Sequence, residues 1–348
     1  MGVGEIARRL VTLLSASGLE LNLIPFTANS APNSDVRDMA FGRYSPVGDL
    51  ISCVNADQLG ALISILGVRP SAVHRHIGFW AWELEQIPEV YKYSANLLDE
   101  IWTISNHAKN AITKISQSTV KKIPIPVPIP KSKTILKKRD FGLASTGFIV
   151  LVSFDYNSDI RRKNPSGAIQ AFKEAFPRRS DATLVIKTIN AERFPHLSEA
   201  LAEEAGGRDD IVFVDGNWSK YHNDALLENA DIFLSLHRAE GYGINMADAM
   251  ARKTAVIATG YSGNLDYMND NSAILVPYGK VGLSNYAGQS FQASWAEPDV
   301  NFAAHALKDL YEKPSALQRL SVNGFEKIRN DHSIGVAASI FSREFLHE

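Results

Sequence analysis

The regular alternation of apolar and amphipathic segments between residues 147 and 260 constrains the fold more than any other feature of the sequence. Near-continuous apolar runs predict strands, and runs with a 3.6-residue hydrophobic period predict helices. The predicted strands are Gly147–Asp155, Ala182–Ile189, Asp210–Gly216, Asp231–His237 and Ala255–Gly260, and the predicted helices are Pro165–Phe176, His196–Gly206, Ser219–Ala230 and Ile244–Lys253. Apolar strands separated by helices belong to a parallel sheet covered on both faces. This half of the chain is therefore predicted to be a doubly wound α/β domain.

The first half repeats this pattern less regularly. Its predicted helices are Glu5–Gly18, Ala56–Gly67, Pro88–Ile101 and Asn106–Ser116, and its predicted strands are Leu19–Phe26, Leu50–Ala56, His74–Trp82, Trp102–Ser105 and Val120–Pro130. With 348 residues the chain exceeds the roughly 250–300 at which single cores stop growing. We expect domains at residues 1–130 and 145–335, joined by the basic, proline-containing segment Pro128–Thr146. Residues 336–348 are expected to form a helix that packs back on the first domain.

Composition excludes several classes of protein. The chain has 36 Lys and Arg against 38 Asp and Glu, a net charge of -2, which gives no reason to expect a nucleic-acid partner. Cys53 is the single cysteine, so neither an intrachain disulfide nor a cysteine-rich metal site can form. No apolar run approaches the roughly 18 residues of a membrane span, and no signal-peptide pattern opens the chain. The simplest expectation is a cytoplasmic protein.

The chain opens with "MGVGEIARRL", which is a Gly-x-Gly turn leading into a helix. A glycine turn that binds phosphate normally follows a strand, and no strand precedes this one. Either the first strand of the domain is missing, or Gly2 and Gly4 belong to a flexible terminus.

Three cations precede the helix that is predicted to begin at Pro165. They are Arg161, Arg162 and Lys163, in "SDIRRKNPSGAIQAF". Proline suits the first helical position because its missing N–H would be unpaired there anyway. Positive side chains at a helix N-terminus oppose the helix dipole, so their presence requires a reason. The pattern predicts an anion site, and the alternative is a solvated basic loop.

An acidic turn follows the strand that is predicted to end at His237. In "RAEGYGINMAD", Glu240 lies between the strand and a helix, and Asp248 follows eight residues later. Helical spacing would separate the two carboxylates by about 12 Å, which suits the two ends of a sugar nucleotide. Gly241 and Gly243 would let the backbone approach such a ligand closely. The alternative is that Glu240 caps the helix.

A third turn, "GYSGNLDY", follows the next predicted strand. The backbone N–H groups around Ser262, Gly263 and Asn264 could hold a phosphate, or the segment is an ordinary turn.

The combination of these motifs resembles the retaining GT-B glycosyltransferases of the family-4, group-1 type. That family typically has Arg-x4-Lys-Gly followed by Glu-x7-Glu, where Lys163 takes the Lys place and Glu240 that of the first Glu. Asp248 replaces the second Glu, and Ser158 stands where the Arg would be. In the first half, "GVGEIARRL", "VNADQL", "IGFWAWELEQIPE" and "DEIWTIS" are similar to a bacterial, polysaccharide-type branch. The resemblance implies two Rossmann-like domains facing across a cleft.

The resemblance also implies an activity. It is the transfer of a hexose from a GDP- or UDP-sugar to an acceptor hydroxyl with retention, in cell-surface polysaccharide synthesis. Lys163 would stabilise the leaving diphosphate in place of a metal, together with Arg162 or Arg161 as the replacement for the arginine missing at Ser158, and Glu240 would bind sugar hydroxyls. The donor-binding residues would be Gly241, Tyr242, Gly243, Asp248, Ser262, Gly263, Asn264 and His237.

The implied partners are a nucleotide-sugar donor and a glycan or lipid-linked glycan acceptor, with no cofactor, no metal and no nucleic acid. Peripheral association with the inner face of a membrane is a further expectation. Gly2, Gly4, His76 and Glu83 are candidates for contacts with the acceptor or the donor sugar. The alternatives are packing for His76 and solvent exposure for Glu83.

Two other functions stay open from the sequence. One is a sugar-nucleotide epimerase of similar architecture, which would need its own acid and base at the sugar carbon. The other is a non-catalytic nucleotide-sugar-binding protein, which Asp248 and Ser158 make reasonable because both depart from the family pattern.

Overall fold

The computed structural model of the chain contains two parallel sheets, each in its own unit. It describes residues 2–26, 41–43, 48–67, 74–144, 147–177 and 181–346. Unit 1 comprises Met1–Pro126, Leu283–Ser294 and His332–Glu348, and unit 2 comprises Val127–Gly282 and Trp295–Asp331. The predicted ends Thr146, His347 and Glu348 lie outside the described residues.

The sheet of unit 2 is built from the apolar runs of the second half. Its strands are β5 (Phe148–Asp155), β6 (Ala182–Ile189), β7 (Ile211–Asp215), β8 (Ile232–Ser235), β9 (Ala255–Thr259) and β10 (Ile274–Val276). The order is β10-β9-β8-β5-β6-β7, and every neighbouring pair is parallel. The chain reverses direction across the sheet between β5 and β8, where open α/β sheets place their ligands. The predicted α/β class is confirmed.

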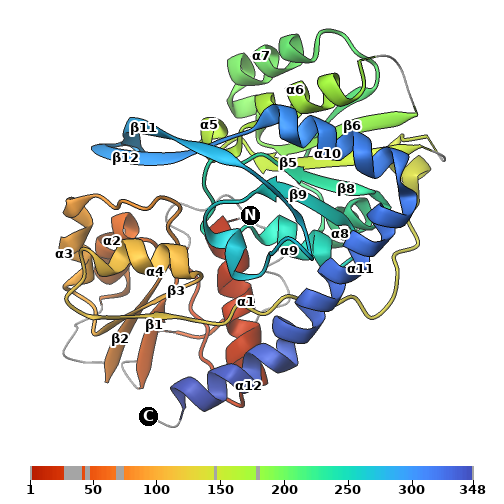
Figure 1. The fold of residues 1–348 in the computed structure, drawn as a ribbon. Coiled ribbons are helices and arrows are strands. Elements are labelled where there is room, and N and C mark those ends of the chain that lie inside the picture. The colour runs from red at the N-terminus through yellow and green to blue at the C-terminus, as the bar shows by residue number, and fades with distance from the viewer. Residues whose placement is uncertain are drawn as a thin grey trace. The chain divides into compact units, whose positions relative to one another are not determined.

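Helices cover both faces of this sheet (Figure 1). One layer contains α6 (Pro165–Ala175), α7 (Pro195–Ala205) and α10 (Val300–Glu312), and the other contains α8 (Lys220–Asn229), α9 (Ile244–Met250) and α11 (Pro314–Asp331). Strand residues such as Leu184 and Ile186 are fully buried against helix residues such as Phe172. The strands therefore need apolar side chains on both faces, which is why their sequences show no alternation.

Unit 1 has a smaller sheet in the order β1-β2-β3-β4, also parallel. Its strands are β1 (Asp49–Ser52), β2 (Arg75–Trp80), β3 (Glu100–Thr103) and β4 (Thr119–Lys122), and its helices are α1 (Gly2–Ala16), α2 (Ala56–Leu66), α3 (Lys92–Ala95), α4 (Asn106–Thr113) and α12 (Ile334–Phe345). α12 packs against α1 (Figure 1). The rings of Phe341 and Phe345 on α12 contact Trp102 of β3, with centroids 5.7 and 5.9 Å away.

Four local predictions in the first half are wrong. Residues 19–26 form no strand: the backbone bonds described for them are Leu19 N to Leu14 O (3.2 Å), at the end of α1, and Gly42 N to Leu23 O (2.8 Å), which make no ladder. The predicted helix at residues 88–101 is reduced to a 3-10 turn, η3 (Glu89–Tyr91), and α3, because residues 100–103 form β3. The predicted strand from residue 120 ends at Lys122, since the prolines that follow cannot donate to a sheet. The Gly-x-Gly segment is the first turn of α1 rather than a loop.

The long hairpin of β11 (Tyr278–Tyr286) and β12 (Gln289–Pro298) was not predicted. Its turn residues Ala287 and Gly288 both have positive φ, 50° and 73°, the conformation that two-residue hairpin turns favour. Its tip belongs to unit 1, where Tyr286 contacts Trp82 at 5.7 Å between ring centroids. Its base belongs to unit 2.

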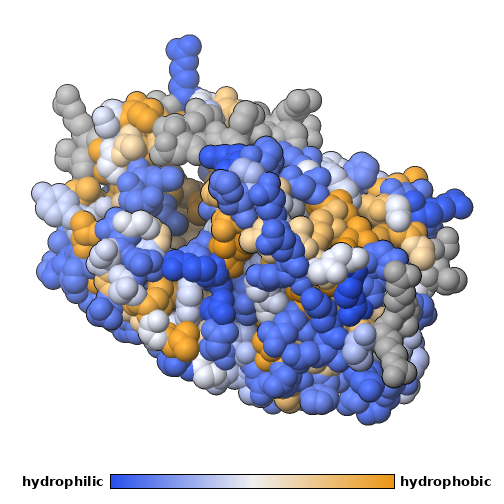
Figure 2. All heavy atoms as spheres, turned by 90° about the horizontal axis from the view of Figure 1, so that it is seen from above, coloured by the Kyte–Doolittle hydropathy of each residue, from blue (hydrophilic) through white to orange (hydrophobic). Residues whose placement is uncertain are grey.

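Exposed apolar side chains are dispersed. Polar and charged residues cover most of the face shown in Figure 2, and apolar residues appear there singly or in small groups. No helix among the residues that the structure describes is long and apolar enough to cross a membrane.

We predict that Phe341→Ala loosens unit 1 and leaves unit 2 unchanged. Phe341 is 1% exposed, and truncating a buried Phe costs about 3–5 kcal/mol. Amide hydrogen exchange should accelerate in β2 and β3 and stay constant in β5 and β6. Phe302→Ala is the control, because this helical side chain is 40% exposed. Equal acceleration in both sheets would contradict the assignment of α12 to unit 1.

Candidate functional site

Three turns meet at the carboxyl edge of the sheet in unit 2. The basic turn (residues 160–164) follows β5 and contains the short helix α5 (Ile160–Lys163). The glutamate turn (residues 236–243) follows β8, and the glycine turn (residues 260–266) follows β9 and contains the 3-10 helix η6 (Gly263–Asp266). Because β5, β8 and β9 are consecutive neighbours in the sheet, their turns lie side by side.

The basic turn is fixed by Asn164, which ends α5 and begins α6. Its φ of 51° turns the chain, and its side-chain oxygen accepts from Gly167 N (3.2 Å) as the N-cap of α6. Its side-chain nitrogen donates to Leu236 O (2.9 Å) in the glutamate turn. Asparagine adopts this left-handed conformation more readily than most residues, so it suits the junction that positions Lys163.

Lys163 and Arg162 converge on the carboxylate of Glu240. Lys163 Nζ donates to Glu240 Oε1, and Arg162 Nη1 lies 3.2 Å from the same oxygen. Arg162 also donates to Ala239 O (2.8 Å) and is only 4% exposed. The sequence left both Arg161 and Arg162 as replacements for the arginine missing at Ser158. Only Arg162 lies against the carboxylate, while Arg161 pairs with Asp159 (2.6 Å).

Glu240 is ionised in this arrangement. Burial raises the pKa of its carboxyl, but the attraction of Lys163 and Arg162 outweighs burial and holds the pKa at about 2, below the ordinary 4.5. The pairs therefore stabilise the fold fully above pH 4.5, and this contribution is lost as the pH falls toward 2. Two cations surround one anion, so an additional negative group is favoured here.

Glu240 does not cap α9. The N-cap of that helix is Gly243, which has no side chain with which to form a capping hydrogen bond. Only Ile244–Met250 is helical, so the separation of about 12 Å that a continuous helix would give between Glu240 and Asp248 does not apply. Asp248 is buried on α9, and its carboxylate lies 3.9 Å from Arg252 Nη1.

The glycine turn packs directly on the glutamate turn. Ser262 Oγ accepts from Glu240 N (2.8 Å), and Gly263 N donates to Glu240 O (2.9 Å). A Cβ at Gly263 would lie 2.0 Å from Gly241 O, which leaves no room for any other residue. The Asn264 side chain is fully buried and donates to Thr259 O (3.0 Å). The side chains of Ser262 and Asn264 thus hold the backbone of the site.

His237 connects the same two turns from inside the protein. It is fully buried, with Nδ1 3.0 Å from Ser235 Oγ and Nε2 3.1 Å from Tyr261 O and 3.2 Å from Asn264 Oδ1. Because both partners of Nε2 are acceptors, that nitrogen carries the proton. Burial lowers the pKa of the ring and keeps it neutral, against the opposing charge of Glu240. Tyr242 is also buried, with its ring 4.8 Å from that of Tyr267.

The remaining predicted residues lie in unit 1. Gly2 and Gly4 are in α1. His76 is fully buried, its Nε2 lies 3.0 Å from Ser52 Oγ, and burial lowers its pKa. Glu83 accepts a hydrogen bond from Tyr286 of the hairpin tip (3.1 Å). These contacts favour the packing interpretation of His76, and they give Glu83 a protein partner instead of solvent alone.

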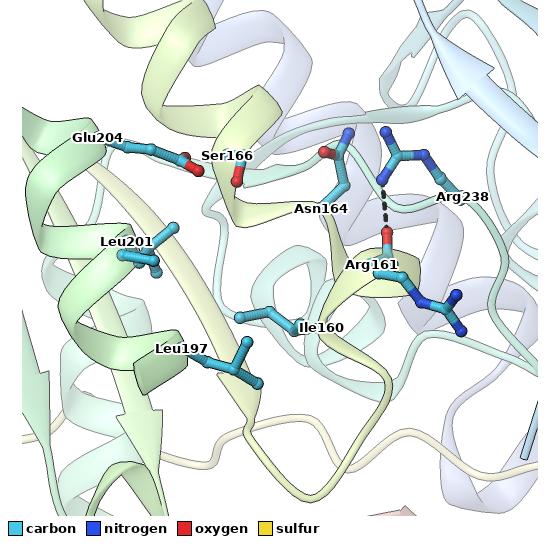
Figure 3. Close-up of a pocket in the computed structure, with 9 residues that line it drawn as sticks. Ile160, Arg161, Asn164, Ser166, Leu197, Leu201, Glu204 and Arg238 are labelled. Atoms are coloured by element: carbon cyan, nitrogen blue, oxygen red, sulfur yellow. Dashed lines mark hydrogen bonds between the residues drawn. The ribbon is translucent and has the colours of Figure 1, made fainter. Parts of the chain in front are cut away.

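A pocket of about 250 Å³ lies beside the basic turn (Figure 3). Leu197, Leu201 and Glu204 of α7 face Ile160 and Ser166 across it, and Arg161 and Arg238 lie at its other side. The basic turn is therefore not packed from this direction. Within the described ranges no group of three or more His, Cys, Asp and Glu side chains is placed to hold a metal ion.

One comparison with known proteins finds a match in the part of the chain that carries these turns. Residues 143–284 match the family model of glycosyl transferases group 1. This segment is therefore similar to the group 1 glycosyl transferases. The match includes all three turns.

Solved structures resemble the chain over most of its length. HepE of Anabaena, in complex with UDP and glucose, has a TM-score of 0.65 at 12% identity, covering 86% of this chain and 78% of its own. Sucrose-phosphate synthase of Thermosynechococcus elongatus has a TM-score of 0.64 at 17% identity, and the match covers 87% of this chain and 73% of that protein. TarM of S. aureus has a TM-score of 0.62 at 11% identity. The match covers 85% of this chain but only 54% of TarM. These likenesses show that the chain has the GT-B fold. No curated protein matches the chain.

We predict that Gly263→Ala separates the glycine and glutamate turns. The added methyl group would collide with Gly241 O, and overpacking of this kind costs about 1–3 kcal/mol. Chemical denaturation should show the loss, with altered amide shifts around Glu240. Gly279→Ala is the matched control, because a Cβ there meets nothing within 4 Å. If the two variants unfold alike, the contact between the turns does not limit stability.

Proposed function

We propose that the chain is a glycosyltransferase that moves a hexose from a nucleoside diphosphate sugar to an acceptor hydroxyl with retention. The observation that carries the proposal is the convergence of Lys163 and Arg162 on the buried carboxylate of Glu240, at the carboxyl edge of the sheet in a segment similar to the group 1 glycosyl transferases. The structures of HepE with UDP and glucose, and of TarM with UDP, support a nucleoside diphosphate donor.

The cations act on the leaving group. When the bond from the anomeric carbon to the phosphate oxygen breaks, the electron pair stays on the diphosphate, whose negative charge increases. Lys163 and Arg162 are already held in place, so they stabilise this charge without reorganising. The acceptor oxygen forms the new bond to the anomeric carbon, and its proton leaves with the diphosphate. In this mechanism a metal ion is not needed.

Glu240 has two roles in this mechanism. Without substrate its carboxylate holds the ammonium of Lys163. An incoming diphosphate competes for that ammonium, and the released carboxylate then accepts hydrogen bonds from hydroxyl groups of the sugar. Exchange of partners therefore couples capture of the diphosphate to orientation of the hexose.

We further propose a GDP- or UDP-sugar donor and a glycan or lipid-linked glycan acceptor, in polysaccharide synthesis at the inner face of a membrane. Thermal-shift measurements with GDP- and UDP-sugars should identify the donor by a rise in Tm. Transfer to a glycan acceptor is then assayed in EDTA, where we expect turnover to persist. Conversion of the donor to an epimer without acceptor would instead indicate an epimerase. Tight binding without any turnover would indicate a binding protein.

We predict that Lys163→Ala lowers kcat/KM on the order of 10²–10³-fold, the usual effect of removing one preorganised charge-stabilising group. Affinity for the nucleoside diphosphate should also fall, because the same ammonium binds the product. Steady-state rates and calorimetric titration measure the two effects. Lys173→Ala, on α6, should change neither, since that ammonium binds Glu204 O (2.8 Å). A fully active Lys163→Ala protein would refute the proposed role.

Glu240→Gln should separate transfer from binding. The amide keeps the size of the side chain but loses the charge that accepts from sugar hydroxyls, so kcat/KM should fall about tenfold or more. Affinity for the bare nucleoside diphosphate should stay equal or increase, because Lys163 is no longer held by a carboxylate. The exposed Glu199 provides the control Glu199→Gln. Normal kcat in Glu240→Gln would remove Glu240 from the mechanism.

A further inference from the structure

Arg238 connects the basic turn to the glutamate turn and to the hairpin. Its backbone N donates to Arg162 O (2.7 Å), and its Nη1 donates to Arg161 O (2.6 Å), as Figure 3 shows. Its carbonyl accepts from Ala296 N of β12 (2.9 Å). Both carbonyls that it holds in the basic turn come directly before Lys163, and Arg238 itself comes two residues before Glu240.

β12 fixes the guanidinium of Arg238 in return. Glu297 accepts two hydrogen bonds from it, from Nε (2.8 Å) and from Nη2 (2.7 Å). The guanidinium also lies over the ring of Trp295, 5.8 Å from its centroid, and that of Arg161 lies 5.6 Å from the same ring. A two-bond pairing of this kind fixes orientation as well as distance, which a lysine could not do.

The basic turn depends on such polar ties because little else holds it on this side. α5 is only four residues long, and Ile160, Arg161 and Asn164 border the pocket beside α7, although Ile160 also packs against the edge of the core of unit 2. The polar ties that hold it to the glutamate turn include the Asn164 side chain, the Arg162 guanidinium, the Lys163 ammonium and Arg238. Arg238 also connects to β12.

We propose that Arg238 is a positioning residue, which together with Glu297 of β12 holds Lys163 and Arg162 beside Glu240, where an incoming diphosphate can displace the carboxylate. The identity of the ligand in this proposal, a nucleoside diphosphate, rests on the proposed function. The hairpin is then a component of the donor site, because Glu297 and Trp295 of β12 contact Arg238 and Arg161 of the turns.

The test compares Arg238→Ala, Arg238→Lys and Glu297→Gln with the control Arg208→Ala. Arg208 forms an equivalent two-bond pair with Asp210 (2.8 and 2.6 Å) but holds no part of the basic turn. The first measurement is the titration of the Glu240 carboxyl by NMR, which requires no substrate. Burial raises this pKa, and the charges of Lys163 and Arg162 lower it, so a change on removing Arg238 reports the displacement of these two cations. The second is calorimetric titration with UDP and GDP.

In Arg238→Ala the Glu240 pKa should rise by about one unit or more, and diphosphate affinity should fall on the order of tenfold. Arg238→Lys should restore part of both, because an ammonium still reaches Arg161 O. Glu297→Gln should raise the Glu240 pKa and lower the diphosphate affinity by smaller amounts. Because the Glu297 side chain is half-exposed, this variant should keep the fold. Arg208→Ala should change neither.

An unchanged Glu240 titration in a folded Arg238→Ala protein would overturn the proposal, as would an equal shift in Arg208→Ala. If the wild-type protein binds neither diphosphate, the proposed function fails, and the titration still decides whether Arg238 positions Lys163.

Discussion

The candidate site depends on one buried carboxylate held by two cations. Burying Glu240 alone would favour its protonated form, and burying Arg162 alone would leave a charge without compensation. Together with Lys163 they form a cluster in which attraction between opposite charges offsets the cost of burying them. The low pKa of Glu240 is the result of this attraction. The cluster retains a net positive charge. It is therefore both a stable part of the fold and a place where a further anion can bind.

The cluster brings together turns that follow three different strands, and each turn forms hydrogen bonds with a neighbouring turn. Gly263 lets the backbone of the glycine turn approach Gly241, at a distance that any side chain would prevent. The neutral ring of His237 joins these turns from inside the protein, because its Nε2 donates to Tyr261 O and Asn264 Oδ1. Arg238 joins the basic turn to β12. Backbone groups of one turn thus form hydrogen bonds with side chains of the next, and these bonds hold the three turns in one arrangement.

Much of unit 2 could be predicted because its signals are local. Strands that are buried on both faces must be apolar throughout, and the predicted strands agree with β5 to β9 within about two residues at each end. In unit 1 the strands are shorter, so the pattern was weaker, and residues 19–26 were wrongly predicted as a strand. The hairpin gave a local signal in Ala287 and Gly288, two residues between runs of similar length, but neither run is strongly apolar. Most side chains of β11 are exposed, and the buried positions of β12 are confined to Trp295, Ala296 and Pro298.

The sequence by itself determined the α/β class and the order of the elements between residues 147 and 260, because these follow from periodicity. It also showed that Lys163 and Glu240 are charges placed at strand ends. Only the tertiary structure decided which arginine joins the cluster, that Glu240 is paired instead of capping a helix, and that His237, Ser262 and Asn264 serve the backbone. These outcomes depend on contacts between residues that are distant in the chain, such as Arg162 with Glu240 or Arg238 with Glu297. Such pairings follow from the strand order, which no local pattern encodes.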